Sequence, residues 1–373
     1  MKVLMQGRFD LQSGGGGDKV QIENTAEELR SLGVEVDVVY NYVRDYSPYD
    51  LVHVFQLDWT PETHFFAREA KRVGLPLCFS PIHHNVKEVK RCDDECVYDY
   101  RRFSKFLFGN QHKRDTFKNV YRSFLNPKKV GPTFHSVFKG LKNMHVETLT
   151  LSDAILVQTE LEAKDLKETY GVDFKWFKVP NGVGEQFFHL EGCQNPLPFD
   201  NYIFSVGRIE PRKNQLNIIK AVESVRQEYE EDIQLVFVGT KNMKNHLEYT
   251  LRFNCELKKN PWITVVDYVP NRDIPAYFKF AKVCVSASWF ETTGLTLLEA
   301  LFCETNAVAS SPRAKEILGD LASYCDPGDL DSISEGIKKE FKAPRPSLSP
   351  GMKAEYTWEN AAKKTLEVYS SFS

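Results

Sequence analysis

Short apolar segments rich in β-branched residues alternate with amphipathic segments along most of the chain. In the first half, the apolar segments are KVLMQG (2–7), VEVDVVY (34–40), LVHVF (51–55), LPLCFS (75–80) and AILVQ (154–158). Their length and composition predict buried strands. Several of the segments between them, such as 19–32 and 160–171, have the period of a helix. This alternation predicts a parallel sheet covered by helices.

The alternation stops at residues 182–201, where four Gly or Pro residues follow the opening Gly and no period is visible. It resumes with YIFSVG (202–207), IQLVFVG (233–239), ITVVD (263–267), KVCVSAS (282–288) and NAVAS (306–310). The break predicts a linker between two α/β domains. Ligands of such sheets bind beyond the carboxyl ends of the strands, so the cleft between the domains is the expected site.

We therefore expect four parts in the chain. They are an N-terminal domain at 1–183, a linker at 184–200, a C-terminal domain at 201–355, and a C-terminal helix at 356–373 that crosses back to the N-terminal domain. A length of 373 residues is comfortable for two domains of this kind.

Charge and composition narrow the function. The 48 Lys and Arg residues balance 51 Asp and Glu residues, which argues against a nucleic-acid binder. No run of 18 apolar residues predicts a membrane-spanning helix, and MKVLMQGRFD becomes charged too early for a signal peptide. The eight cysteines are scattered, and the close pair Cys92 and Cys96 favours a surface loop over a zinc site. These features predict a cytoplasmic protein.

A glycine cluster, SGGGGDKVQ (13–21), precedes the first predicted helix. Glycines at Gly14, Gly15, Gly16 and Gly17 allow the backbone to approach a ligand, and a helix N-terminus favours an anion. The cluster lacks the GxGxxG spacing of a dinucleotide site. A flexible loop without a ligand is the alternative.

The second domain opens with SVGRIEPRKNQ (205–215), in which a strand ends at Gly207 and a helix begins near Asn214. Arg208 and Lys213 lie in this junction. Two cations beside a helix start favour a doubly charged group such as a diphosphate. Alternatively, the two side chains are only solvated surface charges.

Two carboxylates stand eight positions apart in FETTGLTLLEAL (290–301). Glu299 fits a capping box with Thr296 and would then only secure its own helix. Alternatively, the N–H groups after Gly294 face a phosphate, and Glu299 accepts both hydroxyls of a ribose. Glu291 would then reach the next group along the ligand, which suits a nucleotide-sugar.

These motifs resemble retaining glycosyltransferase family 4, of the GT-B fold, over nearly the whole chain. The resemblance is carried by VGRIEPRKN, by the E-x7-E pair in FETTGLTLLEAL and by VPNGV (179–183). SDAILVQTELEAKDL (152–166) and RAKEILGD (313–320) are also similar to family segments. The resemblance implies two Rossmann-like domains whose parallel sheets face each other across a cleft. The domain at 1–183 would be on the acceptor side, and the domain at 201–355 would bind the nucleotide-sugar.

The resemblance also implies an activity. The enzyme would move a hexose from a UDP- or GDP-linked donor to a glycan, glycolipid or lipid-linked acceptor, with retention of configuration and with neither metal nor cofactor. A glycoside hydrolase would not need Arg208 and Lys213. A nucleotide-sugar epimerase of the same fold and a non-catalytic nucleotide-sugar binding module remain alternatives.

Individual roles follow from the resemblance. Arg208 and Lys213 would hold the diphosphate, Glu299 the ribose and Glu291 the donor sugar. The remaining donor-binding positions would be the backbone of Gly294, Leu295 and Thr296, the loop Gly14, Gly15, Gly16 and Gly17, and Gly239 and Tyr268. Tyr268 lies near the expected base pocket, where the usual family glycine is replaced, so the base stays open. His83 in SPIHHN (80–85) would lie near the transferred sugar, with His84 as the alternative.

Residues 101–142 carry eleven Lys or Arg residues and one acid, Asp115, with interleaved Phe and Tyr. Basic residues are attracted to anionic lipid, and aromatic residues anchor at the interface. We expect this segment to dock a membrane surface or a lipid-linked acceptor, which would make the protein peripheral on the cytoplasmic face. A helical insertion with solvated charges and a nucleic-acid site are the alternatives.

Overall fold

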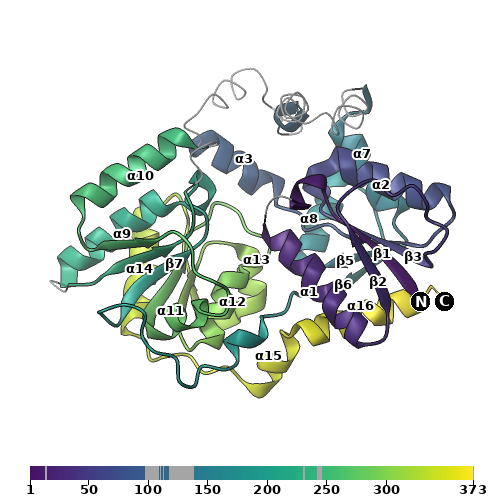
Figure 1. Cartoon of the computed structure of the whole chain (residues 1–373). Coiled ribbons are helices and arrows are strands. Elements are labelled where there is room, and N and C mark those ends of the chain that lie inside the picture. The colour runs from purple at the N-terminus through teal and green to yellow at the C-terminus, as the bar shows by residue number, and fades with distance from the viewer. Residues whose placement is uncertain are drawn as a thin grey trace. The chain divides into compact units, whose positions relative to one another are not determined.

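The computed structural model in Figure 1 describes residues 1–12, 15–96, 109, 111, 113–116, 138–229, 232–241 and 246–372. The described residues form two compact units. The first contains Met1–Val86, the described residues from 109 to Gly182, and the chain from Glu355 onwards. The second begins with the short segment from Lys87 and continues with Val183–Ala354.

The first unit is built on a six-stranded parallel sheet of order β2-β1-β3-β4-β5-β6. Its strands are β1 (Lys2–Gln6), β2 (Glu35–Val39), β3 (Leu51–Phe55), β4 (Leu77–Ser80), β5 (Ala154–Val157) and β6 (Trp176–Lys178). Its helices are η1 (Phe9–Gln12), α1 (Gly17–Ser31), η2 (Leu57–Trp59), α2 (Thr60–Arg72), α7 (Leu141–Leu151), α8 (Glu160–Tyr170) and α16 (Trp358–Ser370). The core joins strand residues such as Val54 and Ile155 to Phe66 of α2 and Leu166 of α8.

The second unit repeats this plan with a parallel sheet of order β12-β11-β10-β7-β8-β9. Its strands are β7 (Tyr202–Val206), β8 (Leu235–Val238), β9 (Ile263–Val266), β10 (Ala281–Ser286), β11 (Asn306–Ala309) and β12 (Ala322–Tyr324). Its helices are α3 (Val86–Glu95), η4 (Glu185–Phe187), η5 (Pro211–Lys213), α9 (Gln215–Tyr229), α10 (Leu247–Lys259), α11 (Ile274–Phe280), α12 (Leu295–Phe302), α13 (Pro312–Leu318), η6 (Gly319–Leu321) and α14 (Leu330–Lys342). A short helix, α15 (Pro350–Glu355), ends where the chain returns to the first unit.

All ten strands expected from the apolar pattern are present, and both sheets are parallel as predicted. The pattern missed β6 and β12, which are three residues long and lie at the edges of their sheets. Such short segments show no apolar run, because an edge strand buries less of its surface than a central strand. Within the described residues, no helix combines the length and apolarity needed to cross a membrane.

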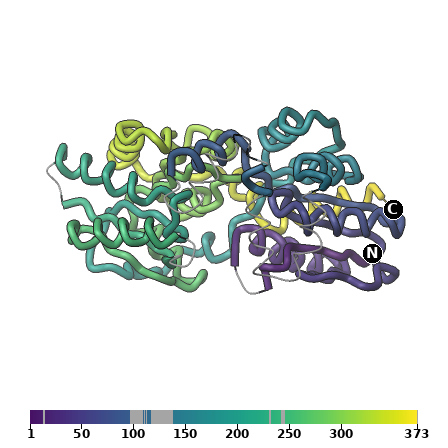
Figure 2. Tube along the Cα trace, turned by 90° about the horizontal axis from the view of Figure 1, so that it is seen from above, coloured from purple at the N-terminus to yellow at the C-terminus, as the bar shows by residue number. Residues whose placement is uncertain are grey.

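Two segments depart from a simple division of the chain at residue 183. Helix α16 packs on α1 in the first unit, as Figures 1 and 2 show, and Tyr369 donates or accepts a 2.6 Å hydrogen bond with buried His53. Helix α3 belongs from Lys87 to the second unit, although it falls inside the predicted domain 1–183. Each unit is therefore built from separate stretches of the chain.

Candidate functional site

Two glycines end neighbouring strands of the second unit. Gly207 follows β7 with φ 142° and Gly239 follows β8 with φ 152°. A Cβ at Gly239 would lie 2.1 Å from the Gly207 carbonyl oxygen, and a Cβ at Gly207 would lie 3.2 Å from Cε of Lys213. The structure thus gives Gly239 a part in packing the strand ends. Its predicted contact with the donor stays a prediction.

A cluster of five charged side chains lies beyond β7 and β10. Lys213 forms an ion pair with Glu291, and Arg212 Nη1 lies 3.4 Å from Glu291 Oε1. Arg212 Nε also donates to Glu210 Oε1 at 3.1 Å. Arg208 is more exposed, at 54%, and its Nε lies 3.7 Å from Glu210 Oε2. Three cations and two carboxylates leave the cluster one positive charge in excess.

Burial and pairing act against each other in this cluster. Burial alone would raise the pKa of Glu291, but Lys213 and Arg212 lower it to about 2. Burial lowers the pKa of Lys213, and Glu291 counteracts only part of that effect. Burial would also raise the pKa of Glu210, which Arg212 and Arg208 bring below its usual value. Both carboxylates are therefore charged at neutral pH, and each is held by fixed cations.

Arg212 is a member of this cluster that the sequence reasoning missed. The prediction paired Arg208 with Lys213, whereas Arg212 is the arginine that contacts Glu291. Residues 212 and 213 both belong to the single turn η5, which starts at Pro211. The sequence SVGRIEPRKNQ could have indicated Arg212, because a short turn after a strand places adjacent side chains near the same strand end.

The start of α12 lies next to this cluster in the sequence. Gly294 is the N-cap residue with φ 71°, and no side chain caps the helix. Thr296 lies inside the helix, so the capping box with Glu299 is wrong. The N–H groups of Leu295 and Thr296 belong to the first turn, where a helix offers no acceptor of its own. They are available to an anion, as the resemblance predicts.

Glu299 lies one turn into α12 and is partly exposed. Within the part of the chain that the structure describes, its carboxyl group has no hydrogen-bond or ion-pair partner. Burial raises the pKa of Glu299 to about 8, so much of it is protonated at neutral pH. A hydroxyl-rich ligand such as ribose would supply the missing partners. Tyr268, the predicted neighbour of the base, follows β9 and is 74% exposed.

In the first unit, His83 and His84 meet one carboxylate. His83 Nδ1 lies 2.7 Å from Asp58 Oδ1, and His84 Nδ1 lies 2.6 Å from Asp58 Oδ2. The His83 backbone N–H donates to Glu162 Oε1 at 2.7 Å. Burial would raise the pKa of Asp58, but the two histidines lower it well below its usual range. Asp58 is thus an ionised group that orients both rings, and the sequence reasoning did not include it.

The loops that carry these residues follow adjacent strands. Gln56 after β3 has φ 75°, and Ile82 after β4 has φ 44°. A β-branched residue is rarely found in the left-handed region, and such strain concentrates at functional sites. The backbone N–H of Leu57 donates to the Pro81 carbonyl at 2.7 Å, which ties the two loops together. Asp58 was detectable from its place directly beyond a buried strand.

The glycine loop of the first unit is only partly described, because Gly14 lies outside the described residues. Gly16 is the N-cap of α1, and Gly17 is its first residue. Asp18 is buried in the first turn and accepts from Arg8 Nε at 2.6 Å. The favourable end of this helix dipole therefore already faces a carboxylate of the chain itself. A role for Gly15, Gly16 and Gly17 in donor binding stays a prediction.

Two further predictions concern the region after residue 86. Cys92 lies in α3 and Cys96 follows it, and both are buried, so the expected surface loop is wrong. Most of the basic segment 101–142 lies outside the described residues, and its docking role stays a prediction. No group of three or more His, Cys, Asp or Glu side chains among the described residues could hold a metal ion.

Comparison with known proteins relates the second half of the chain to a family. Residues 194–364 match the model of the family described as glycosyl transferases group 1. The chain is 26% identical over 197 residues to O-antigen chain mannosyltransferase B of Escherichia coli, a match that covers 51% of each protein. It is 22% identical over 377 residues to alpha-monoglucosyldiacylglycerol synthase of Streptococcus pneumoniae, which covers 94% of this chain and 82% of the relative. The chain spans about half of the first of these relatives.

Solved structures extend the likeness to the whole chain. Sucrose-phosphate synthase from Thermosynechococcus elongatus has a TM-score of 0.74 at 14% identity, with 99% of this chain and 98% of that chain covered. Anabaena HepE in complex with UDP and glucose has a TM-score of 0.66 at 13% identity, with full coverage of both chains at 100%. The whole chain therefore has the GT-B fold, and its residues 194–364 match the model of the glycosyl transferases group 1 family.

Proposed function

We propose that the protein is a retaining glycosyltransferase that moves a hexose from a UDP- or GDP-linked donor to a glycan or lipid-linked acceptor without a metal ion. The observation that carries the proposal is the cluster of Arg212, Lys213 and Glu291 beyond β7 and β10. Its carboxylate, Glu291, lies three residues before Gly294, the N-cap of α12. Fixed cations and free helical N–H groups together suit a diphosphate.

The geometry suggests how the cluster would act. Lys213 is paired with Glu291. A bound diphosphate would compete for Lys213 and Arg212, which frees Glu291 to accept hydrogen bonds from the donor sugar. Negative charge grows on the diphosphate as the sugar leaves, so fixed cations stabilise the transition state more than the intact donor. Glu299 would accept the ribose hydroxyls.

The relatives support the choice of substrates. One relative is named as an O-antigen mannosyltransferase and another as a synthase of a glucosylated diacylglycerol, so both names point to glycan or lipid acceptors. The solved HepE complex contains UDP. We extend these substrate classes to the present chain. Retention of configuration is proposed from the family resemblance. The metal-free mechanism is proposed because Arg212 and Lys213, beside Glu291, would supply the positive charge that a metal ion supplies in metal-dependent enzymes.

The first unit would contribute His83. Its ring is buried and oriented by Asp58, and the family resemblance gives this histidine a role at the transferred sugar. Segment 101–142 would dock the lipid-linked acceptor through its basic residues, a proposal that rests on its charge alone. Binding of anionic vesicles that weakens with added salt is the expected result, and no binding at low salt would contradict it.

The decisive experiment measures binding and turnover with a panel of UDP- and GDP-hexoses. We expect one donor to be hydrolysed slowly by water and faster once a lipid-linked glycan is added. Lys213→Ala should abolish most of this activity, whereas Lys220→Ala, on the exposed face of α9, should not. Binding without turnover would instead identify a binding module. A changed hexose without an acceptor would identify an epimerase.

A further inference from the structure

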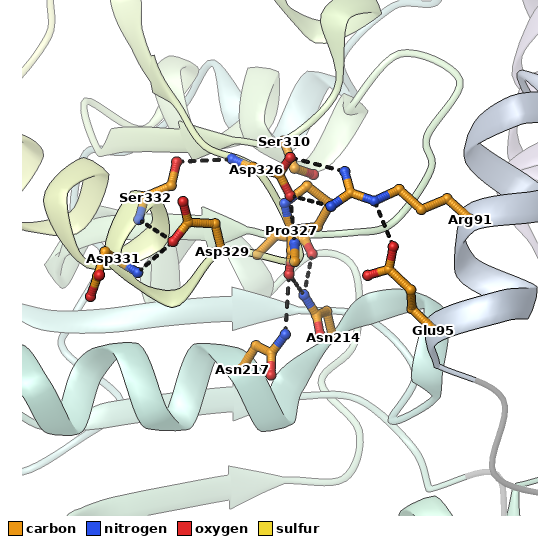
Figure 3. A network of polar contacts seen from close by, with 12 residues as sticks. Arg91, Glu95, Asn214, Asn217, Ser310, Asp326, Pro327, Asp329, Asp331 and Ser332 are labelled. Carbon is orange, nitrogen blue, oxygen red and sulfur yellow. Dashed lines mark hydrogen bonds and ion pairs between the residues drawn. The ribbon is translucent and has the colours of Figure 1, made fainter.

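Helix α3 packs against the unit that carries the charge cluster. Arg91 of α3 makes a two-pronged ion pair with Asp326, with Nη1 2.9 Å from Oδ2 and Nη2 2.8 Å from Oδ1 (Figure 3). Its Nε donates to Glu95 Oε1 at 3.0 Å on the same helix. A bidentate pair of this kind fixes direction as well as distance. Arg91 is therefore held at both ends of its guanidinium group.

The same helix makes an apolar contact with a second loop. Cys92 and Cys96 are buried together with Trp289, and Phe290 packs against them. The Arg91 guanidinium lies over the Trp289 ring, 5.2 Å from its centroid. Trp289 and Phe290 immediately precede Glu291, so α3 covers the loop that presents the sugar-binding carboxylate of the proposed site.

This loop is tied directly to η5. The Trp289 backbone N–H donates to the Arg212 carbonyl at 2.9 Å, and the Arg212 guanidinium lies 5.4 Å from the centroid of the Phe290 ring. A displacement of Trp289 or Phe290 would therefore move Arg212 and Glu291 together. Arg212 and Glu291 are the two members of the charge cluster that this displacement would affect.

The loop that contains Asp326 reaches the cluster by another route. Asn214, the neighbour of Lys213, donates to the Pro327 carbonyl at 2.7 Å and to the Ala287 carbonyl at 3.0 Å (Figure 3). Asn217 of α9 also donates to Pro327, at 3.1 Å. One buried amide thus links the two loops that α3 contacts, and it does so beside Lys213.

We propose that α3 is a positioning element of the donor site, and that Arg91 is its main positioning residue. By holding Asp326 and Trp289, Arg91 fixes the loops that aim Glu291 and Lys213. Electrostatic catalysis depends on charges that are already in place, and such charges need a supporting layer of contacts. The kinetic part of this inference rests on the proposed function, whereas the structural coupling does not.

Arg91 is suited to a clean test because it is 42% exposed and Asp326 is 45% exposed. Surface ion pairs contribute little to the free energy of unfolding, so Arg91→Ala should fold. Arg91→Lys keeps the positive charge but cannot form the bidentate pair with Asp326. Arg252→Ala is a matched control, since Arg252 forms a comparably exposed pair with Glu248 at 2.7 Å on α10.

Hydrogen exchange and kinetics should be measured on the full chain of each variant. In Arg91→Ala we expect faster exchange in the peptides that cover 287–291 and 324–328, and faster alkylation of Cys92 relative to exposed Cys255. The value of kcat should fall about tenfold with a smaller change in the KM for the donor, as expected when an interaction of the transition state is lost. Arg91→Lys should recover part of both effects, and Arg252→Ala should show neither.

The two proposals fail in different ways. Unchanged exchange at 287–291 in Arg91→Ala would overturn the inference about α3, whatever the activity. Altered exchange with an unchanged kcat would likewise show that α3 has only a structural part. If the wild-type protein turns over no nucleotide-sugar, the proposed function fails, and the exchange and alkylation results alone decide the coupling.

Discussion

Each unit gathers its polar side chains beyond the ends of adjacent parallel strands, but the chemistry differs. The second unit places Arg212 and Lys213 around Glu291, with an excess of positive charge in the cluster. The first unit places one carboxylate, Asp58, between two imidazole rings. The same α/β plan therefore offers one site that suits an anion and another that suits an oriented histidine. The difference comes from a few residues after each strand.

The backbones at these strand ends also differ. In the second unit the positive φ values at the strand ends and in the loop after β7 fall on Gly207, Gly239 and Asn214, residue types that adopt them at little steric cost. In the first unit they fall on Gln56 and Ile82, where each strained residue costs on the order of 1–3 kcal/mol. Strain of this kind persists only where the surroundings enforce it. The strain at Gln56 and Ile82 therefore supports a functional role for the loops around Asp58 and His83.

The largest expected effect is that of Lys213→Ala. Without this ammonium group the departing diphosphate loses a fixed positive charge, and turnover should fall about a hundredfold, or ~3 kcal/mol. The dissociation constant of the intact donor should change less, because the charge on the diphosphate grows during the reaction. Transfer rates and donor binding are to be measured with Lys220→Ala as the control. A loss of affinity that matches the loss of turnover would contradict this assignment.

Asp58→Asn tests the other half of the comparison. The amide keeps the shape of the side chain but removes the charge that orients His83 and His84. The value of kcat should therefore fall about tenfold, which is less than the roughly 10²–10⁴-fold contribution of a general acid or base itself. Free UDP or GDP should bind as before, because the charge cluster belongs to the second unit. Weaker binding of the free nucleotide in Asp58→Asn would show that the two sites do not divide the work in this way.

The sequence predicted the sheets well because central parallel strands are buried on both sides and read as continuous apolar runs. It also named Lys213 and Glu291, which the structure brings together beyond β7 and β10, whereas the ribose-binding role of Glu299 stays a prediction. It missed the contacts of Arg212 with Glu291 and of Asp58 with His83, because each joins residues far apart in the sequence, which no local pattern shows. It also counted residues 87–95 in the first domain and expected a surface loop at Cys92, because a local pattern does not say which unit a segment will pack on.

Glu299→Gln should have a smaller effect and a distinctive pH dependence. The ordinary pKa of 4.5 is raised to about 8 in the folded protein. The unfolded chain thus binds fewer protons at this site between these pH values, and the free energy of unfolding falls as the pH rises through the window. Thermal unfolding from pH 5 to 9 should show this fall in the wild-type protein and less of it in Glu299→Gln.

The same variant should bind the free nucleotide several-fold more weakly, because an amide is a poorer acceptor for two ribose hydroxyls than a carboxylate. Nucleotide affinity is to be compared at pH 8, where ionised Glu299 is well populated in the wild-type protein. Equal affinities would remove Glu299 from the ribose site. A lower stability of Glu299→Gln at every pH would indicate a structural part for this carboxyl group.

The smallest expected effect is that of a chelator. If Arg212 and Lys213 supply the positive charge, the wild-type transfer rate should be the same with and without excess EDTA. Added magnesium should not restore activity to Lys213→Ala. Abolished wild-type transfer in EDTA, with recovery in magnesium, would contradict the metal-free mechanism.

The interleaving of the two units has a consequence for synthesis on the ribosome. The first unit can add α16 only after the second unit has been synthesised. At the contact, Gly182 lies against the backbone of Trp358, where a Cβ at position 182 would lie 2.1 Å from the Trp358 nitrogen. Domains usually fold in the order of translation. Here the segment Val183–Ala354 can complete most of its core while the first half of the chain still lacks a helix. The half of the protein that is translated first is therefore the half that finishes folding last.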